Sequence, residues 1–88
     1  MDAKTILGLN LRRLRVERGY SQERLALDAG IDRAYVGRIE RGSENVTITR
    51  LEALAAVLQV PIAALFEEPD DHGRKPLALR PGRKPKTR

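Results

Sequence analysis

Two arginines on one side of a short predicted helix are the residues of this chain best suited to recognising another molecule. The helix is predicted over residues 32–41, where Val36 and Ile39 have the spacing of an inward-facing apolar side. Arg33 and Arg38 fall on the opposite side. Because a guanidinium group can donate two parallel hydrogen bonds to guanine O6 and N7, both are candidate base readers. The alternative is that they are solvated surface charges.

The same outward face carries two small residues, Ala34 and Gly37, with Tyr35 and Arg41 at its edges. Ala34 has a side chain that suits contact with a thymine methyl group. Glycine inside a helix costs about 1 kcal/mol relative to alanine, so Gly37 either lets the helix sit closer to DNA or is a neutral change. The predicted set of base-contacting residues is Arg33, Ala34, Tyr35, Gly37 and Arg38.

Other helices must hold this face in place, and their starts share one pattern. An apolar residue precedes a capping residue, and a second apolar residue follows four positions after the cap, as in a hydrophobic staple. The pattern occurs at Tyr20, Ser21 and Leu25, at Ile31, Asp32 and Val36, and at Val46, Thr47 and Leu51. With the apolar spacing elsewhere, it predicts helices over residues 5–18, 21–29, 32–41 and 47–58, and a short fifth helix that opens at Pro61.

Only Gly30 and Ile31 separate the second predicted helix from the third. Glycine can take a positive φ without strain, which permits the sharp turn that this spacing requires. Ala26 is small enough to let the two helices approach closely. We therefore predict an all-α fold of five helices in which residues 21–41 form a helix-turn-helix, the arrangement that places a helix in the major groove of DNA.

Composition limits the other classes of function. The 88 residues suit one domain, predicted over 1–68, followed by a disordered basic tail over 69–88 that carries the whole net charge of +5. With no cysteine and a single histidine, His72, we expect no metal site, no cofactor and no enzymatic activity. No apolar run reaches the roughly 18 residues that span a bilayer, and the start of the chain does not match a signal peptide. We expect a cytoplasmic location and no membrane partner.

Four segments form a recognisable set: Leu11-Arg12-Arg13-Leu14-Arg15, Gly19-Tyr20-Ser21-Gln22-Glu23-Arg24-Leu25-Ala26, Ala29-Gly30-Ile31 and Val36-Gly37-Arg38-Ile39-Glu40-Arg41-Gly42. With them the chain resembles the phage repressor and Cro type of helix-turn-helix regulator, also called the XRE family. The segment Asn45-Val46-Thr47-Ile48 is similar to the controller proteins of restriction-modification systems. The resemblance implies a compact lambda-repressor-like domain. It also implies a transcription regulator that inserts the helix over 32–41 into the major groove of operator DNA.

The resemblance also implies roles for residues outside that helix. Gln22 would contact a phosphate together with the N-terminus of its helix. Arg15 and Glu40 would form a structural ion pair that orients the recognition helix without contacting bases. Further phosphate contacts are predicted for Arg41, Ser43, Asn45 and Thr47, and capping is an equally good role for Thr47.

Specific binding by so small a domain predicts a homodimer on two half-sites of double-stranded DNA. The apolar residues Val57, Ile62, Leu65 and Phe66 are the candidate interface, with packing inside one monomer as the alternative. The basic tail could bind phosphates or enter a minor groove in the manner of an AT-hook. A different class, an antitoxin-type module that binds both DNA and a protein partner, also fits the sequence.

Overall fold

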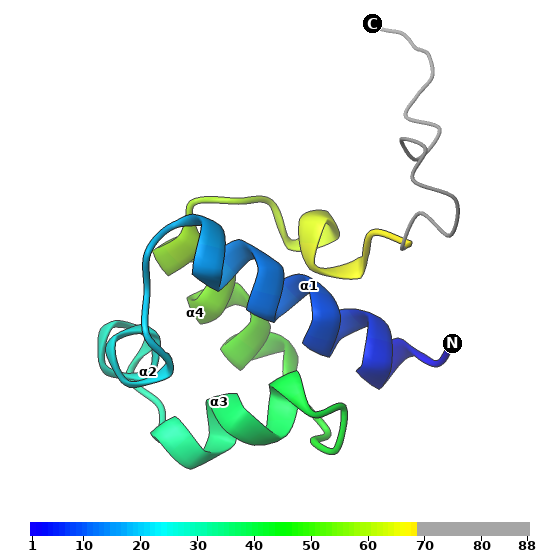
Figure 1. Ribbon diagram of the computed structural model, residues 1–88, viewed down its shortest axis with the longest axis horizontal. Helices are drawn as coiled ribbons and strands as arrows, with labels where there is room; N and C mark the ends of the chain where they lie inside the picture. Colours follow the sequence, from blue (N-terminus) through cyan, green and yellow to red (C-terminus); the bar gives the residue numbers. More distant parts are fainter. Residues whose placement is uncertain (69–88) are drawn as a thin grey trace, which may run out of the picture.

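The computed structural model describes residues 1–68, and within this range its regular secondary structure is all helical, with no strand. Four α-helices are followed by one 3-10 helix (Figure 1). Their bounds are α1 (Ala3–Glu17), α2 (Gln22–Ala29), α3 (Arg33–Glu40), α4 (Ile48–Leu58) and η1 (Ile62–Phe66). The predicted fifth helix is thus a single 3-10 segment and not an α-helix. The predictions made for the tail, residues 69–88, lie outside the described residues.

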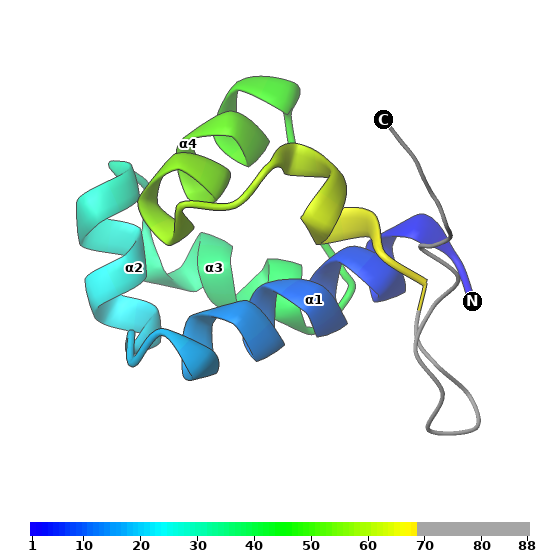
Figure 2. The same cartoon turned by 90° about the horizontal axis from the view of Figure 1, so that it is seen from above.

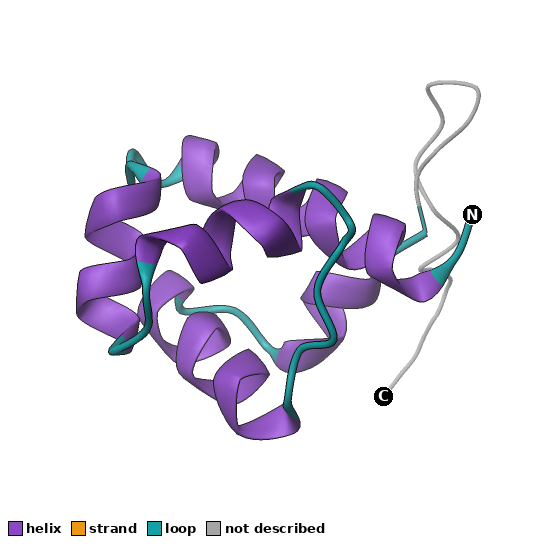
Figure 3. Ribbon diagram, turned by 90° about the horizontal axis from the view of Figure 1, so that it is seen from below, coloured by secondary structure: helices purple, strands orange, loops and turns teal. Residues whose placement is uncertain are grey.

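The helices pack around one core, and α3 lies at the outside of the molecule. α1 contacts α3 and η1, and α2 contacts α3 and α4. Figure 2 shows η1 returning after α4 to lie against α1, and Figure 3, seen from below, shows α3 in front. The largest fully buried side chains come from every helix: Leu11, Leu25, Val36, Ile39, Leu54, Leu58 and Leu65. Burial of this shared core fixes how α3 is presented.

Side-chain caps begin three of the α-helices. Ser21 and Thr47 each accept a hydrogen bond from the backbone N–H three residues further on, at 2.9 and 3.2 Å. Asp2 does the same for α1 at 2.9 Å, so this helix begins at Ala3, two residues earlier than predicted. Asp32 occupies the N-cap position of α3, but its carboxylate makes no capping hydrogen bond. The sequence pattern therefore places the starts of α2, α3 and α4, and two of its three caps form.

The α-helices are closed by residues with positive φ, namely Gly19, Gly30, Gly42 and Gln59. At the end of α2 the N–H groups of Gly30 and Ile31 donate to the carbonyls of Leu27 and Ala26, at 3.2 and 3.0 Å. This pair of hydrogen bonds is the Schellman motif, which satisfies carbonyls that the helix leaves free and reverses the chain. Because Gly30 has φ +74°, the predicted tight turn between α2 and α3 depends on a conformation that glycine adopts readily.

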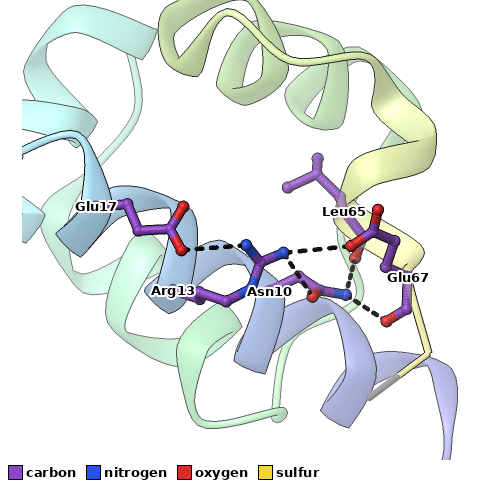
Figure 4. Close-up of polar contacts among 5 residues, drawn as sticks. All are labelled: Asn10, Arg13, Glu17, Leu65 and Glu67. Carbon is purple, nitrogen blue, oxygen red and sulfur yellow. Dashed lines mark hydrogen bonds and ion pairs between the residues drawn. The ribbon is translucent and has the colours of Figure 1, made fainter. Parts of the chain in front are cut away.

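Two buried contacts that sequence reasoning missed hold α1 against its neighbours. The first is Asn10, whose side-chain amide donates to the carbonyls of Leu65 and Glu67 at 3.0 and 2.8 Å (Figure 4). Arg13 donates to Asn10 Oδ1 and forms ion pairs with Glu17 and Glu67. Together these contacts tie η1 to α1.

The position of η1 corrects part of the predicted dimer interface. Leu65 is fully buried in the core of the monomer, so its assignment to an interface between subunits is wrong. Its backbone carbonyl also accepts a hydrogen bond from Asn10. Ile62 and Phe66 remain 38% exposed, and Val57 packs partly buried against the core.

The second contact is a close approach between α1 and the end of α3 at Gly8. A Cβ atom added to Gly8 would lie 2.5 Å from the carbonyl oxygen of Ile39 and 2.8 Å from that of Glu40. These are backbone atoms, which cannot turn aside as a flexible side chain can. The two helices therefore meet backbone to backbone at this point, and only glycine fits there.

Replacing Gly8 by alanine is expected to force α1 and α3 apart. Overpacking of this kind typically costs about 1–3 kcal/mol, and a fall of this size in the free energy of unfolding should appear in urea denaturation. Ala3→Gly, at the exposed start of the same helix, is the control for a general effect of exchanging these two residues. If Gly8→Ala leaves the free energy of unfolding unchanged, the backbones of α1 and α3 do not approach closely enough to exclude a Cβ atom.

Replacing Gln59 by glycine is expected to stabilise the protein. Gln59 ends α4 with φ +58°, a conformation that strains residues other than glycine, and its side chain is exposed. Since glycine also loses more backbone freedom on folding, the net gain should be roughly 0.5–1 kcal/mol. Thermal denaturation measures the effect, with Gly30→Ala as the reverse control that should lower the melting temperature. A lower melting temperature for Gln59→Gly would contradict this reading.

Candidate nucleic-acid interface

The buried face of α3 leaves a defined set of side chains pointing outward. Val36 and Ile39 lie in the core, as their spacing predicted. Arg33, Ala34 and Arg38 are exposed. Because the opposite face of the helix packs against α1 and α2, these three side chains project from a support that cannot easily rotate.

Tyr35 is not exposed, and the prediction that it lies at the edge of the outward face is wrong. Only 7% of its surface is accessible, and the residue belongs to the core cluster. The guanidinium carbon of Arg50, in α4, lies 4.6 Å from the centroid of the ring, and that of Arg38 lies 5.7 Å from it. Both distances fit cation–π contacts. The ring therefore packs at the junction of α3 and α4, where its size fills space that helical spacing alone does not reveal.

Gly37 is also covered, although it was expected on the outward face. A Cβ atom built on it would lie 3.3 Å from Nη1 of Arg41 and 3.9 Å from Oε1 of Gln22. Both atoms belong to flexible side chains, which could move away from a larger residue. The absence of a side chain at this position lets Arg41 and Gln22 lie close to the surface of α3.

Arg38 is held by the loop that follows its own helix. Its Nε donates to Oε1 of Glu44 at 2.6 Å, and its backbone carbonyl accepts hydrogen bonds from the N–H and the hydroxyl of Ser43 at 3.0 and 3.2 Å. The hydrogen bond from Arg38 lowers the pKa of Glu44 below its ordinary value of 4.5. Sequence reasoning missed Glu44, because it lies beyond the helix, where no periodic pattern predicts its partner.

A carboxylate at the end of α3 joins three helices. Arg15, in α1, donates from Nε to Oε2 of Glu40 at 2.6 Å and from Nη2 to Oε1 at 3.1 Å, and these side chains are only 13% and 5% exposed. Arg15 also donates from Nη1 to the carbonyl of Tyr20 at 2.9 Å. Gln22, at the start of α2, donates from Nε2 to Oε1 of Glu40 at 3.0 Å. We call Arg15, Glu40 and Gln22 the Glu40 network.

The remaining predicted phosphate contacts lie on or beside the loop between α3 and α4. Arg41, Ser43, Asn45 and Thr47 are all exposed. Ser43 uses its hydroxyl on the carbonyl of Arg38, and Thr47 caps α4, so both already have structural roles. Gln22 commits one amide N–H to Glu40, which leaves its second N–H for another acceptor.

Two other kinds of site can be examined over residues 1–68. In this part of the chain, no three side chains of histidine, cysteine, aspartate or glutamate come together as ligands for a metal ion. None of its helices combines the length and apolar character required to cross a bilayer.

Comparison with known proteins places this geometry in a family. Residues 11–65 match the model of the helix-turn-helix family HTH_3. This chain belongs to that family. The match includes α2 and α3 with the turn at Gly30, and similar proteins include HTH-type transcriptional regulators of Bacillus licheniformis and Escherichia coli.

Several relatives of the helix-turn-helix chain are regulators or controller proteins. Control protein C.SmaI of Serratia marcescens is 42% identical over 66 residues, which are 75% of this chain and 79% of that protein. A hypothetical transcription factor of Neisseria meningitidis is 39% identical over 70 residues, 80% of this chain and 66% of that protein. The crystal structure of the restriction-modification controller protein C.AhdI from Aeromonas hydrophila superposes with a TM-score of 0.70 at 43% identity, covering 72% of this chain and 96% of that one. The resemblance stated from the sequence is confirmed.

Removing the charge of Glu40 should destabilise the fold far more than removing an exposed acidic partner. Glu40→Gln leaves Arg15 almost buried beside a neutral amide, and breaking a buried pair in this way costs about 3–5 kcal/mol. The matched control is Asp28→Asn, whose partner Arg24 is 64% exposed, and exposed pairs are worth about 0–1 kcal/mol. Urea denaturation of both variants measures the difference. Equal, small losses would show that the Glu40 network does not hold the helices together.

Proposed function

We propose that this protein is a transcription regulator that binds operator DNA by placing α3 in the major groove, with residues 1–68 as the DNA-binding domain. The observation that carries the proposal is the set of exposed side chains on α3, Arg33, Ala34 and Arg38, opposite a fully buried face. A major groove about 12 Å wide admits one α-helix. A helix held on one side by its own protein can present its other side to base edges.

Within this proposal, the two arginines supply sequence recognition. Each guanidinium can donate to O6 and N7 of one guanine, and Ala34 can contact a thymine methyl group between them. Tyr35 packs beneath Arg38 and Arg50 and is left out of the base readers, because its ring is buried. Gly37 supports recognition indirectly, since it lets Gln22 and Arg41 lie close to α3.

Phosphate contacts beside α3 would set its position in the groove. Gln22 begins α2, where the free N–H groups of a helix N-terminus favour an anion. Arg41, Ser43, Asn45 and Thr47 follow α3 as far as the start of α4 and are exposed. Contacts of this kind fix register and orientation but carry no base information.

We further propose that the protein acts as a homodimer on two half-sites. A single recognition helix reads too few base pairs for specific control, and two copies separated by about one turn of DNA solve this problem. Ile62 and Phe66 on η1, both 38% exposed, and the partly buried Val57 on α4 are the apolar residues that support this interface.

Selection of bound duplexes from random DNA tests the base readers. Arg33→Ala and Arg38→Ala should each abolish the preference at one base pair of each half-site, a loss of about 1–3 kcal/mol of discrimination. Arg12→Ala is the control, because Arg12 is exposed on α1 and its substitution removes the same charge as the α3 variants do. If either α3 variant weakens all sequences equally, as the loss of a phosphate contact would, that arginine does not read a base.

A further inference from the structure

We infer that Glu44 is a specificity-determining residue, which acts by holding Arg38 so that its two terminal nitrogens point toward a base. This inference rests on the proposed function, because it concerns how one of the proposed base readers is positioned. Glu44 lies outside α3 and would not itself contact the base. It is a positioning residue that works through Arg38.

The first observation is which donor of Arg38 is occupied. An arginine side chain carries five N–H donors, one on Nε and two on each terminal nitrogen. Among residues 1–68, the hydrogen bonds of the Arg38 guanidinium use Nε alone, which donates to Glu44 at 2.6 Å. The terminal pair, Nη1 and Nη2, is therefore available. This is the pair that can donate in parallel to O6 and N7 of a guanine approached end-on.

The second observation is that Arg38 is restrained from several sides. Ser43 binds its backbone carbonyl twice, and the guanidinium lies 5.7 Å from the centroid of the buried Tyr35 ring. The side chain of Glu44 is 20% exposed, against 45% for that of Arg38. Glu44 is thus the more buried partner, and its carboxylate restrains the more exposed guanidinium of Arg38.

The ion pair between Arg38 and Glu44 also has a consequence for charge. An isolated carboxylate beside a DNA-binding helix would repel the phosphate backbone and weaken binding to every sequence. Paired with Arg38, Glu44 cancels part of the attraction that this arginine has for phosphates in general. It leaves the directional hydrogen bonds of the terminal nitrogens intact. The pairing should therefore lower non-specific affinity while it preserves recognition of one base pair.

The test compares Glu44→Ala, Glu44→Gln and Arg38→Ala with the wild-type protein. The probes are the duplex selected by the wild-type protein from random DNA, duplexes with each single base-pair change, and an unrelated duplex, all at one salt concentration. Glu44→Ala should lower discrimination at the base pair read by Arg38 by about 2- to 12-fold, the cost of ordering one long side chain. Its affinity for the unrelated duplex should rise. Glu44→Gln keeps an oxygen that can accept from Nε, and should restore most of the discrimination.

Two controls separate this effect from others. Glu52→Ala removes the same charge at an exposed position of α4, and should leave the discrimination unchanged. In an Arg38→Ala background, Glu44→Ala should have no further effect on discrimination, because the residue that it positions is absent. Circular dichroism of each variant checks that the helices are retained.

Two results would overturn the inference. If Glu44→Ala changes the affinity for all duplexes by one factor and leaves discrimination unaltered, the ion pair is only a surface contact. If Glu44→Ala still lowers discrimination when Arg38 is alanine, Glu44 contacts a base directly, for instance the amino group of cytosine. Failure of the proposed function is seen separately, as a wild-type protein that binds all duplexes alike.

Discussion

The arrangement of this protein depends on one carboxylate at the end of α3. Glu40 accepts hydrogen bonds from Arg15 of α1 and Gln22 of α2, and it lies where Gly8 lets the backbones of α1 and α3 meet. At the other end of α3, the turn at Gly30 fixes the angle at which the chain leaves α2. With both ends held and one face buried, α3 has little freedom to rotate. Its exposed side chains therefore keep a constant relation to the rest of the domain.

This restraint explains how a domain with no excess charge can favour DNA. Residues 1–68 contain ten lysines and arginines and ten aspartates and glutamates, so long-range attraction supplies little. Selectivity must come from where individual groups lie. Glu40 forms an ion pair with Arg15 inside the fold, and Glu44 forms one with Arg38 on the surface. In the proposed function, Arg33 and the terminal nitrogens of Arg38 would make the directional contacts, which discriminate between bases better than net charge does.

The sequence predicts most of the fold because the signals are local. Each cap and its apolar pair lie within six consecutive residues, and Gly30 alone indicates the turn between α2 and α3. What the sequence does not reveal are contacts between distant segments. Asn10 donates to backbone carbonyls 55 and 57 residues away, and the sequence around Asn10 does not indicate these partners. The buried ring of Tyr35 lies against Arg50 of another helix, a contact between distant segments that helical spacing alone does not reveal. Glu44 lies in a loop, where side-chain direction has no period.

The central claim, that α3 enters the major groove with its arginines at guanine, is tested most directly by methylation interference on a duplex selected by the protein. Methylation of guanine N7 blocks the major-groove edge, whereas methylation of adenine N3 blocks the minor groove. We predict that N7 methylation of particular guanines in each half-site abolishes binding, and that N3 methylation at the same half-sites is tolerated. Binding that survives every N7 methylation and is lost on N3 methylation would contradict the claim.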